Sequence, residues 1–491
     1  MSVSNQIKKG GLWNAFETGG MIFCQFVYLY LMARFLDKED FGLMAIVNSI
    51  LNVGNIVTEG GMGAALIQKQ GITEKHKNAA LQGGFLFGAI FFLICLLGAD
   101  RIAHFFNNAQ LSDVLRVCSV NFIILSLSSV SLNLLYKTFN FRYSSIITLI
   151  STFVGYSLGT ILAIKGYGVW SLVFATLTAS LLKTMGYFYF APVKIKFGFY
   201  FKEWKELFGF GSGMILLKFS NYLSNGGVNL LLGKILPVSS LGVFDRSFQL
   251  KTLPSKHLGG ILDKVMFPVM SQIQDEKERF FKVFYFGLGV SNSILFPLTL
   301  YFVYFSEEIV NIMLGKNWFE AVIPLQIMFL VLPFSISNKM ADSAIRAKGL
   351  IYKNVIRKCI YVVVLLLSTF LLGYFYGIIG AAIAVTGSYI FNYFLMINLV
   401  RRIFKKSFKE VFYTPLKDAL KLTFVIGMIL IFYHILIQVF DINQLIGFLI
   451  FSLILGILIC GIIFTQPRML GPYINEIIKS ILKSRKNKSG L

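Results

Sequence analysis

The residues best suited to chemistry lie in one charged stretch of an otherwise apolar chain. Residues 242–260 read GVFDRSFQLKTLPSKHLGG and include Arg246, Lys251, Lys256 and His257. Cationic side chains of this kind bind phosphate and carboxylate groups through charge-assisted hydrogen bonds. The stretch therefore predicts a binding site for an anion.

Of the other charged residues within apolar segments, five are further site candidates, and these are Lys218, Lys339, Glu17, Glu59 and Asp342. A charge at the centre of a membrane helix costs roughly 2.5–3.5 kcal/mol on insertion scales, so it is retained where it is paired, hydrated or used. We expect the two lysines to join the anion site. The three carboxylates are candidates for coupling to H⁺ or Na⁺, because the pKa of a buried carboxylate is easily moved. Alternatively, Glu17 and Glu59 pair with the lysines and only hold helices together.

The charged stretch predicts a helix with one polar face. At 100° per residue, Arg246, Lys256 and His257 fall within a stripe about 120° wide, and Lys251 falls outside it. Pro254 is expected to kink this helix and to shift the phase of its two halves. We expect the stripe to face a cavity in the protein and not lipid.

The elements that must position these residues are membrane-spanning helices. Of the 491 residues, 56% are hydrophobic and 14% are charged, whereas soluble proteins have roughly a quarter charged residues. Apolar runs near the roughly 20 residues needed to cross a bilayer recur throughout. The fourteen predicted spans are 11–36, 41–68, 77–99, 111–136, 142–164, 166–190, 204–233, 239–270, 280–305, 319–345, 352–374, 377–400, 415–440 and 443–465. A basic tail, 466–491, follows.

The basic residues predict the orientation of these spans. With a cytoplasmic N-terminus, 32 Lys and Arg residues lie on the inner side, Arg357 among them, and 7 lie on the outer side. Cytoplasmic loops are the richer in Lys and Arg, so both termini are expected in the cytoplasm. The net charge of +23 is explained by this rule and does not predict binding of nucleic acid. We see no removable signal peptide, and the five cysteines have no metal-like spacing.

The chain also repeats itself. Residues 33–44 match residues 233–244 at an offset of 200, where Gly42 meets Gly242. At an offset of 209, Gly168 meets Gly377. The fold class predicted is an all-α integral membrane protein with two six-helix repeats around a central cavity and an added C-terminal helix pair. The corresponding division is 1–200, 201–405 and 406–491.

Motifs for several enzyme chemistries are missing from the sequence. It has no GxxxxGK[ST] phosphate loop, no HExxH motif and no GxSxG motif. We expect no catalytic residues, no bound metal and no cofactor apart from a coupling ion.

Several motifs carry a resemblance to a known family. They are GLWNAFETGGMIFCQFVYLYLMARFLDKEDFGLMAIV with EGGMGAALIQKQGITE near the start, then GVWSLV, LGVFDRSFQLKTLP and VMFPVMSQIQDEKER. Over about residues 1–400 the chain resembles the polysaccharide-transporter family of Wzx-type flippases, in its colanic-acid and teichuronic-acid exporter branch. That family belongs to the superfamily that includes multidrug (MATE) exporters and lipid II flippases. The resemblance implies a MATE-like bundle of two lobes, with Arg246 and Lys251 as substrate contacts.

The resemblance also implies a function, which is to move undecaprenyl-pyrophosphate-linked oligosaccharides from the cytoplasmic to the outer leaflet by alternating access. The expected partners are this substrate, the lipid bilayer of the bacterial inner membrane and the polysaccharide polymerase or assembly machinery. Two alternatives stay open. An ion-coupled multidrug exporter is expected to prefer cations and to rely on acidic residues. A membrane-embedded polysaccharide polymerase or ligase is expected to use a sizeable outer loop, whereas the predicted outer loops are short.

Overall fold

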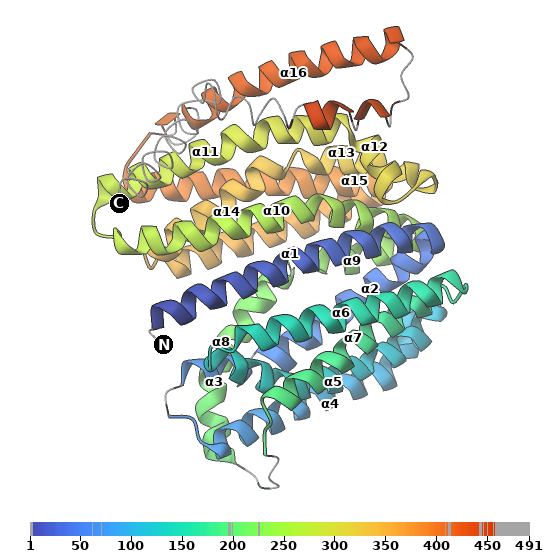
Figure 1. Cartoon of the computed structure of the whole chain (residues 1–491), viewed down its shortest axis with the longest axis vertical. Coiled ribbons are helices and arrows are strands. Elements are labelled where there is room, and N and C mark those ends of the chain that lie inside the picture. Colours follow the sequence, from blue (N-terminus) through green and yellow to red (C-terminus); the bar gives the residue numbers. More distant parts are fainter. Residues whose placement is uncertain are drawn as a thin grey trace. The chain divides into compact units, whose positions relative to one another are not determined.

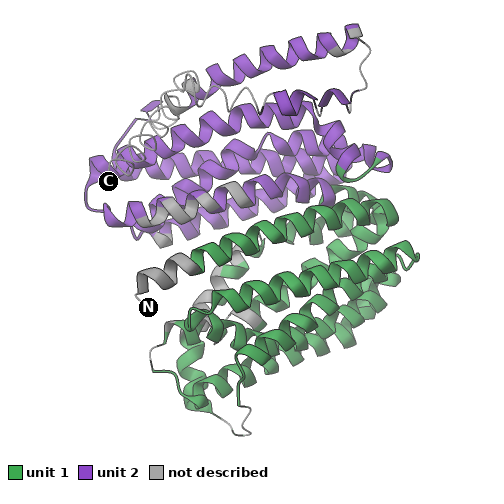
Figure 2. Ribbon diagram, in the orientation of Figure 1, with its two compact units in different colours: residues 1–245, 313–315 green, residues 246–312, 316–491 purple. Residues whose placement is uncertain are grey.

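The computed structural model consists of helices, and the residues that it describes contain no β-strand. Those residues are 3–60, 62–69, 71–194, 198, 200–223, 226–407, 409–410, 414–440, 444, 446–448, 450–454 and 456. The chain divides into two compact units, which are coloured separately in Figure 2. Unit 1 comprises residues 1–245 and 313–315, and unit 2 comprises 246–312 and 316–491. The division predicted from the sequence at residues 200 and 405 stays a prediction.

Unit 1 contains nine helices in its described part and the first residues of a tenth (Figure 1). The nine are α1 (Val3–Phe35), α2 (Lys38–Gly60), α3 (Met62–Gln68), α4 (Glu74–Phe105), α5 (Gln110–Lys137), α6 (Phe141–Ile164), α7 (Val169–Phe190), α8 (Phe201–Leu223) and α9 (Gly226–Ile235). Helix α4 packs on α5, α6 packs on α7, and α1 packs on α6. Helix α2 lies against α4, α5, α8 and α9, so these helices limit which face of α2 stays exposed.

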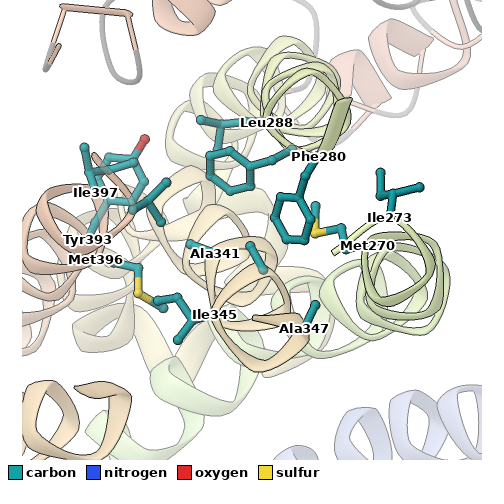
Figure 3. Packing of buried hydrophobic residues seen from close by; sticks show 13 residues of the cluster. Met270, Ile273, Phe280, Leu288, Ala341, Ile345, Ala347, Tyr393, Met396 and Ile397 are labelled. Carbon is teal, nitrogen blue, oxygen red and sulfur yellow. The ribbon is translucent and has the colours of Figure 1, made fainter. Parts of the chain in front are cut away.

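Unit 2 begins within the long helix α10 (Val238–Gln272). It continues with α11 (Lys277–Tyr304), α12 (Ser306–Met313), the 3₁₀ helix η1 (Lys316–Ala321), α13 (Val322–Phe329), α14 (Leu332–Ala347), α15 (Ile351–Phe404) and α16 (Thr414–Phe440). Its buried core, shown in Figure 3, joins α10, α11, α14 and α15 through apolar side chains that include Met270, Phe280, Leu288, Ile345 and Met396. Because α10 takes part in this core, its polar residues are held in a fixed position on unit 2.

The membrane-spanning character predicted from the sequence is confirmed. In the described residues, nine helices are long and apolar enough to cross a membrane, or ten if one bent pair counts as a single span. The charged helix α10 is not among them. Helix α15 covers two predicted spans, 352–374 and 377–400, and is kinked at Gly377, whose backbone is not helical. Most of the last predicted span, 443–465, and the basic tail lie outside the described residues.

Two predicted spans each contain two described helices: span 41–68 contains α2 and α3, and span 204–233 contains α8 and α9. A third span differs in shape from the prediction. Span 319–345 is bent by 45° between α13 and α14. Pro333 lies in the first turn of α14, and its missing N–H prevents a continuous hydrogen-bonded helix at that point. The predicted outer loop at 306–318 includes a short helix, α12.

Two glycines support the repeat with the offset of 200. A Cβ atom on Gly42 would overlap the carbonyl oxygen of Val238, and a Cβ atom on Gly242 would overlap that of Lys38. The contact is reciprocal, since Lys38 and Val238 are themselves equivalent at this offset. The first turns of α2 and α10 therefore meet through their backbones, and glycine is required at both positions.

A second glycine pair supports the repeat with the offset of 209. Gly168 precedes α7 with φ 52° and ψ −134°, and Gly377 lies within α15 with φ 60° and ψ −142°. Side chains other than glycine rarely adopt this backbone conformation. The two copies therefore make the same turn between their fifth and sixth spans.

Candidate functional site

The predicted site residues are divided between the two units. Unit 1 holds Glu17, Glu59 and Lys218, and unit 2 holds Arg246, Lys251, Lys256, His257, Lys339 and Asp342. The central cavity predicted from the sequence stays a prediction.

Helix α10 positions its four candidates at different degrees of burial. It remains helical from Val238 to Gln272, through Pro254. Arg246 is half-buried, Lys251 is buried and Lys256 is exposed. The side chain of His257 lies outside the described residues. The predicted polar stripe is therefore not one uniformly exposed face.

Lys251 is the most deeply buried of the predicted cations, with 1% of its surface exposed. Its Nζ lies 4.0 Å from the ring centroid of Tyr389 on α15 and 5.0 Å from that of Phe248 on α10. Tyr389 in turn packs edge-to-face on Tyr361, with ring centroids 5.7 Å apart. Aromatic faces stabilise a cation electrostatically. In the described part of the chain, Lys251 has no carboxylate partner, so no carboxylate competes there with an anionic ligand.

Lys339 comes from α14 and lies against the same helix. Its Nζ donates a hydrogen bond to the carbonyl oxygen of Ser255, at 2.8 Å. A Cβ atom on Gly259 would overlap the Lys339 side chain, so the glycine provides the space through which the lysine passes. Ser255 follows Lys251 by four residues, about one helical turn, so the Lys339 ammonium group reaches α10 about one turn from Lys251. Unit 2 thus brings together two of the predicted cations, and an anion bound near them would be attracted by both.

Asp342, a predicted coupling residue, is held in an ion pair. Its Oδ1 lies 3.1 Å from Nη2 of Arg357, and its Oδ2 lies 4.0 Å from Nζ of Lys358. Arg357 also donates to the Oδ1 atoms of Asn354, at 3.0 and 2.8 Å, and of Asn392. A role for Asp342 in ion coupling would therefore require this pair to open.

Arg357 is the residue that the sequence analysis missed. It was counted with the basic residues of the inner side, but only 6% of its surface is exposed. A signal was present, because Asn354 and Tyr361 lie three residues before and four residues after it. This spacing places all three on one face of a helix that begins at Ile351.

Unit 1 positions its candidates in more neutral surroundings. Glu17 on α1 is half-buried, and its Oε2 accepts a hydrogen bond from Oγ of Ser145 on α6 at 2.7 Å. Lys218 on α8 is half-buried. Glu59 belongs to the last turn of α2, and its side chain lies outside the described residues. The partner of Glu17 in the described part is thus a serine, not one of the two lysines proposed as the alternative.

Comparison with known proteins gives consistent results. A family model described as polysaccharide biosynthesis protein matches residues 31–323. The lipopolysaccharide biosynthesis protein WzxC of Escherichia coli (strain K12) is 23% identical over 407 residues, which are 82% of this chain and 82% of that protein. The teichuronic acid biosynthesis protein TuaB of Bacillus subtilis (strain 168) is 23% identical over 353 residues, which are 71% of this chain and 72% of that protein.

A solved structure supports the fold. The lipid II flippase MurJ, in an inward closed conformation, matches with a TM-score of 0.73 and 16% identity, over 96% of this chain and 99% of that chain. At this level of identity the likeness establishes the helical fold, and function must be argued from the site.

Proposed function

Because the chain belongs to the polysaccharide biosynthesis protein family, we propose that it is a flippase that carries a lipid-linked oligosaccharide across the membrane. The multiple apolar spans make it a multi-pass membrane protein. Relatives that cover most of the chain are named for the biosynthesis of lipopolysaccharide and teichuronic acid. The proposed activity is transport and not catalysis.

The observation that carries this proposal is the buried charge of Lys251. A buried lysine on a helix of a multi-pass membrane protein, stabilised by aromatic rings and without a carboxylate partner in the described residues, suits an anionic cargo. Lys339 adds a second cation about one helical turn away. A pyrophosphate that joins lipid and sugar would supply the matching negative charge. A multidrug exporter that prefers cations would be disfavoured by the same pair.

The finer details of the proposal follow from the sequence. The cargo would be an oligosaccharide on undecaprenyl pyrophosphate, moved from the cytoplasmic to the outer leaflet of a bacterial inner membrane by alternating access. Arg246, Lys218, Lys256 and His257 would complete the substrate contacts. Glu17, Glu59 or Asp342 would couple the movement to H⁺ or Na⁺. A polysaccharide polymerase would take over the flipped unit.

The test is to delete the gene and to measure which leaflet holds the lipid-linked oligosaccharide. Spheroplasts treated with a membrane-impermeant glycosidase report the outer leaflet. We expect the unit to accumulate on the cytoplasmic side, and the wild-type gene to restore its export. The double variant Arg246→Ala/Lys251→Ala should reach the membrane. The export rate that it restores should be at least tenfold below that of the wild type, because one hydrogen bond to a charged group contributes about 1.5–3 kcal/mol.

The matched control is Arg116→Ala. Arg116 is an exposed cation paired with Asp100, at 2.7 Å, and is not one of the predicted site residues. It should restore export fully. Normal delivery of the unit to the outer leaflet in the deletion strain would overturn the flippase proposal. The multidrug alternative would then be tested by drug resistance.

A further inference from the structure

Helix α2 of unit 1 carries a row of carboxamides that the sequence analysis did not use. Asn48, Asn52 and Asn55 follow one another at spacings of four and three residues. At 100° per residue they fall within about 60° of one another around the helix. Asn48 and Asn52 are exposed, and Asn55 is half-buried. We refer to these three residues as the carboxamide stripe.

The stripe is not explained by hydrogen bonds within the protein. In the part of the chain that the structure describes, neither the Asn48 nor the Asn52 side chain has a hydrogen-bond partner. The Oδ1 atom of Asn55 is buried and also accepts no hydrogen bond there. An exposed carboxamide on a membrane-spanning helix is strongly disfavoured against hydrocarbon. The stripe therefore faces a hydrated space or a polar ligand.

Neighbouring contacts keep the stripe pointing in one direction. Oη of Tyr222 on α8 donates to the carbonyl oxygen of Ser49 at 2.6 Å. Ser49 and Leu51, which flank the stripe on either side, are both buried. Helix α2 is therefore unable to rotate and bury its asparagines without breaking these contacts.

The repeat indicates that the fold does not require these carboxamides. At the offset of 200, the counterparts of the three asparagines on α10 are Phe248, Thr252 and Ser255. The hydroxyl of Thr252 donates to the carbonyl oxygen of Phe248 within its own helix, at 2.7 Å. One copy of the helix thus folds without any carboxamide at these positions.

We propose that the carboxamide stripe binds the uncharged sugar rings of the cargo, an inference that rests on the proposed function. A carboxamide both donates and accepts hydrogen bonds, as a sugar hydroxyl does, and it adds no charge. From Asn48 to Asn55 the stripe extends about 10 Å along the helix, enough to follow more than one sugar ring. The cations of α10 and α14 serve the pyrophosphate, and the stripe serves the saccharide.

The experiment measures binding to the purified full-length chain in detergent micelles by native mass spectrometry. Two probes are compared, bare undecaprenyl pyrophosphate and undecaprenyl pyrophosphate that carries a neutral disaccharide. For Asn48→Ala/Asn52→Ala we expect Kd for the disaccharide probe to rise at least tenfold. Kd for the bare probe should change less than twofold, which also shows that the variant is folded. Asn52→Gln keeps the carboxamide and should recover part of the loss.

Two controls separate this inference from the proposed function. Thr252→Val changes the position equivalent to Asn52 and should leave both Kd values unchanged. Lys251→Leu should weaken the binding of both probes. If it weakens the binding of neither, the proposed pyrophosphate site is refuted, whatever the result for the stripe. If Asn48→Ala/Asn52→Ala weakens the binding of both probes equally, or of neither, the sugar subsite is refuted. This conclusion stands even if Lys251→Leu weakens binding as expected.

Discussion

Helices α2 and α10 occupy equivalent places in the two copies of the sequence repeat, but they differ in charge at equivalent positions. The reciprocal backbone contact at Gly42 and Gly242 establishes that their first turns correspond. Counted with the same offset of 200, the pairs are Ile46 and Arg246, Leu51 and Lys251, and Ile56 and Lys256. One copy is aliphatic wherever the other is cationic.

The difference is not a difference in burial. Leu51 has 3% of its surface exposed and Lys251 has 1%. An aliphatic residue is thus sufficient to pack this helix, and a lysine at the same place adds the cost of desolvating a charge. Packing alone therefore does not account for the cations of α10, which supports their proposed role in binding. The carboxamide stripe, which α2 carries and α10 lacks, supports a corresponding role for unit 1.

The largest expected effect on stability comes from a substitution at Gly42, where the two copies of the repeat are alike. In Gly42→Ala, the added methyl group would overlap the Val238 carbonyl oxygen, and neither helix backbone is able to move aside cheaply. The expected destabilisation is more than about 3 kcal/mol, above the usual range for overpacking because the overlap is with backbone, and little folded protein should be recovered. The measurement is the amount of monodisperse protein after size-exclusion chromatography.

Gly98→Ala is the matched control for this prediction. Gly98 lies within α4, where the nearest atom to an added Cβ is Ile102 Cδ1 at 3.8 Å. It should be neutral or slightly stabilising, since alanine favours a helix. Normal recovery of Gly42→Ala would show that the two first turns are not in backbone contact.

The next largest loss of stability is expected when the lysine of α10 is introduced at the equivalent position of α2. Leu51→Lys introduces a lysine at a position of α2 that is as buried as Lys251 on α10. The expected cost is about 2.5–3.5 kcal/mol, as for a lysine at the centre of a membrane helix. Thermal unfolding in micelles measures it, with Leu51→Met as the control of similar size. An unchanged Tm for Leu51→Lys would mean that position 51 is already hydrated.

The reverse exchange should separate function from stability. Lys251→Leu places on α10 the residue that its counterpart has on α2, so the free energy of unfolding should stay the same or increase. Transport of the lipid-linked oligosaccharide should fall at least tenfold, because the buried cation is lost. Export in the deletion strain and Tm in micelles are the two readouts. A marked loss of Tm together with activity would mean that Lys251 is a structural residue.

Much of the fold could be predicted from the sequence because few physical signals determine it. Long apolar runs identified the spans, and the glycine pairs identified the repeat, which the backbone angles of Gly168 and Gly377 support. A bend inside a span, such as that between α13 and α14, leaves the average hydropathy unchanged and was therefore missed.

The candidate site could be predicted only in part. Charged residues in apolar segments are conspicuous, so Lys251 and Lys339 were found. Arg357 was missed because it lies near the end of its span, where a basic residue usually meets water. The pairing of Asp342 depends on the side-by-side packing of α14 and α15, which the sequence does not reveal. The asparagines of α2 carry no charge, and only their exposure distinguishes them.

The smallest effect concerns a carboxyl group of unit 2 that lies outside the site. Glu308 is half-buried on α12, beyond the spans, and its Oε2 has no hydrogen-bond partner in the described residues. Burial raises the pKa of the Glu308 carboxyl above its usual 4.5, and the charge of Glu307 raises it further. The folded state thus binds this proton more tightly, so stability falls as the pH rises from 4.5 through the raised pKa, and it stays lower above that pKa.

Glu308→Gln should therefore be more stable than the wild type at neutral pH. The gain should be less than about 1 kcal/mol, since part of the side chain still meets solvent, and it should disappear below pH 4.5, where both forms are neutral. Tm measured across this pH range tests it, with Glu39→Gln, an exposed carboxyl on α2, as control. Export should be unchanged, because a charge that binds no cargo is a cost to stability alone. A loss of export would extend the functional charges of unit 2 beyond α10 and α14.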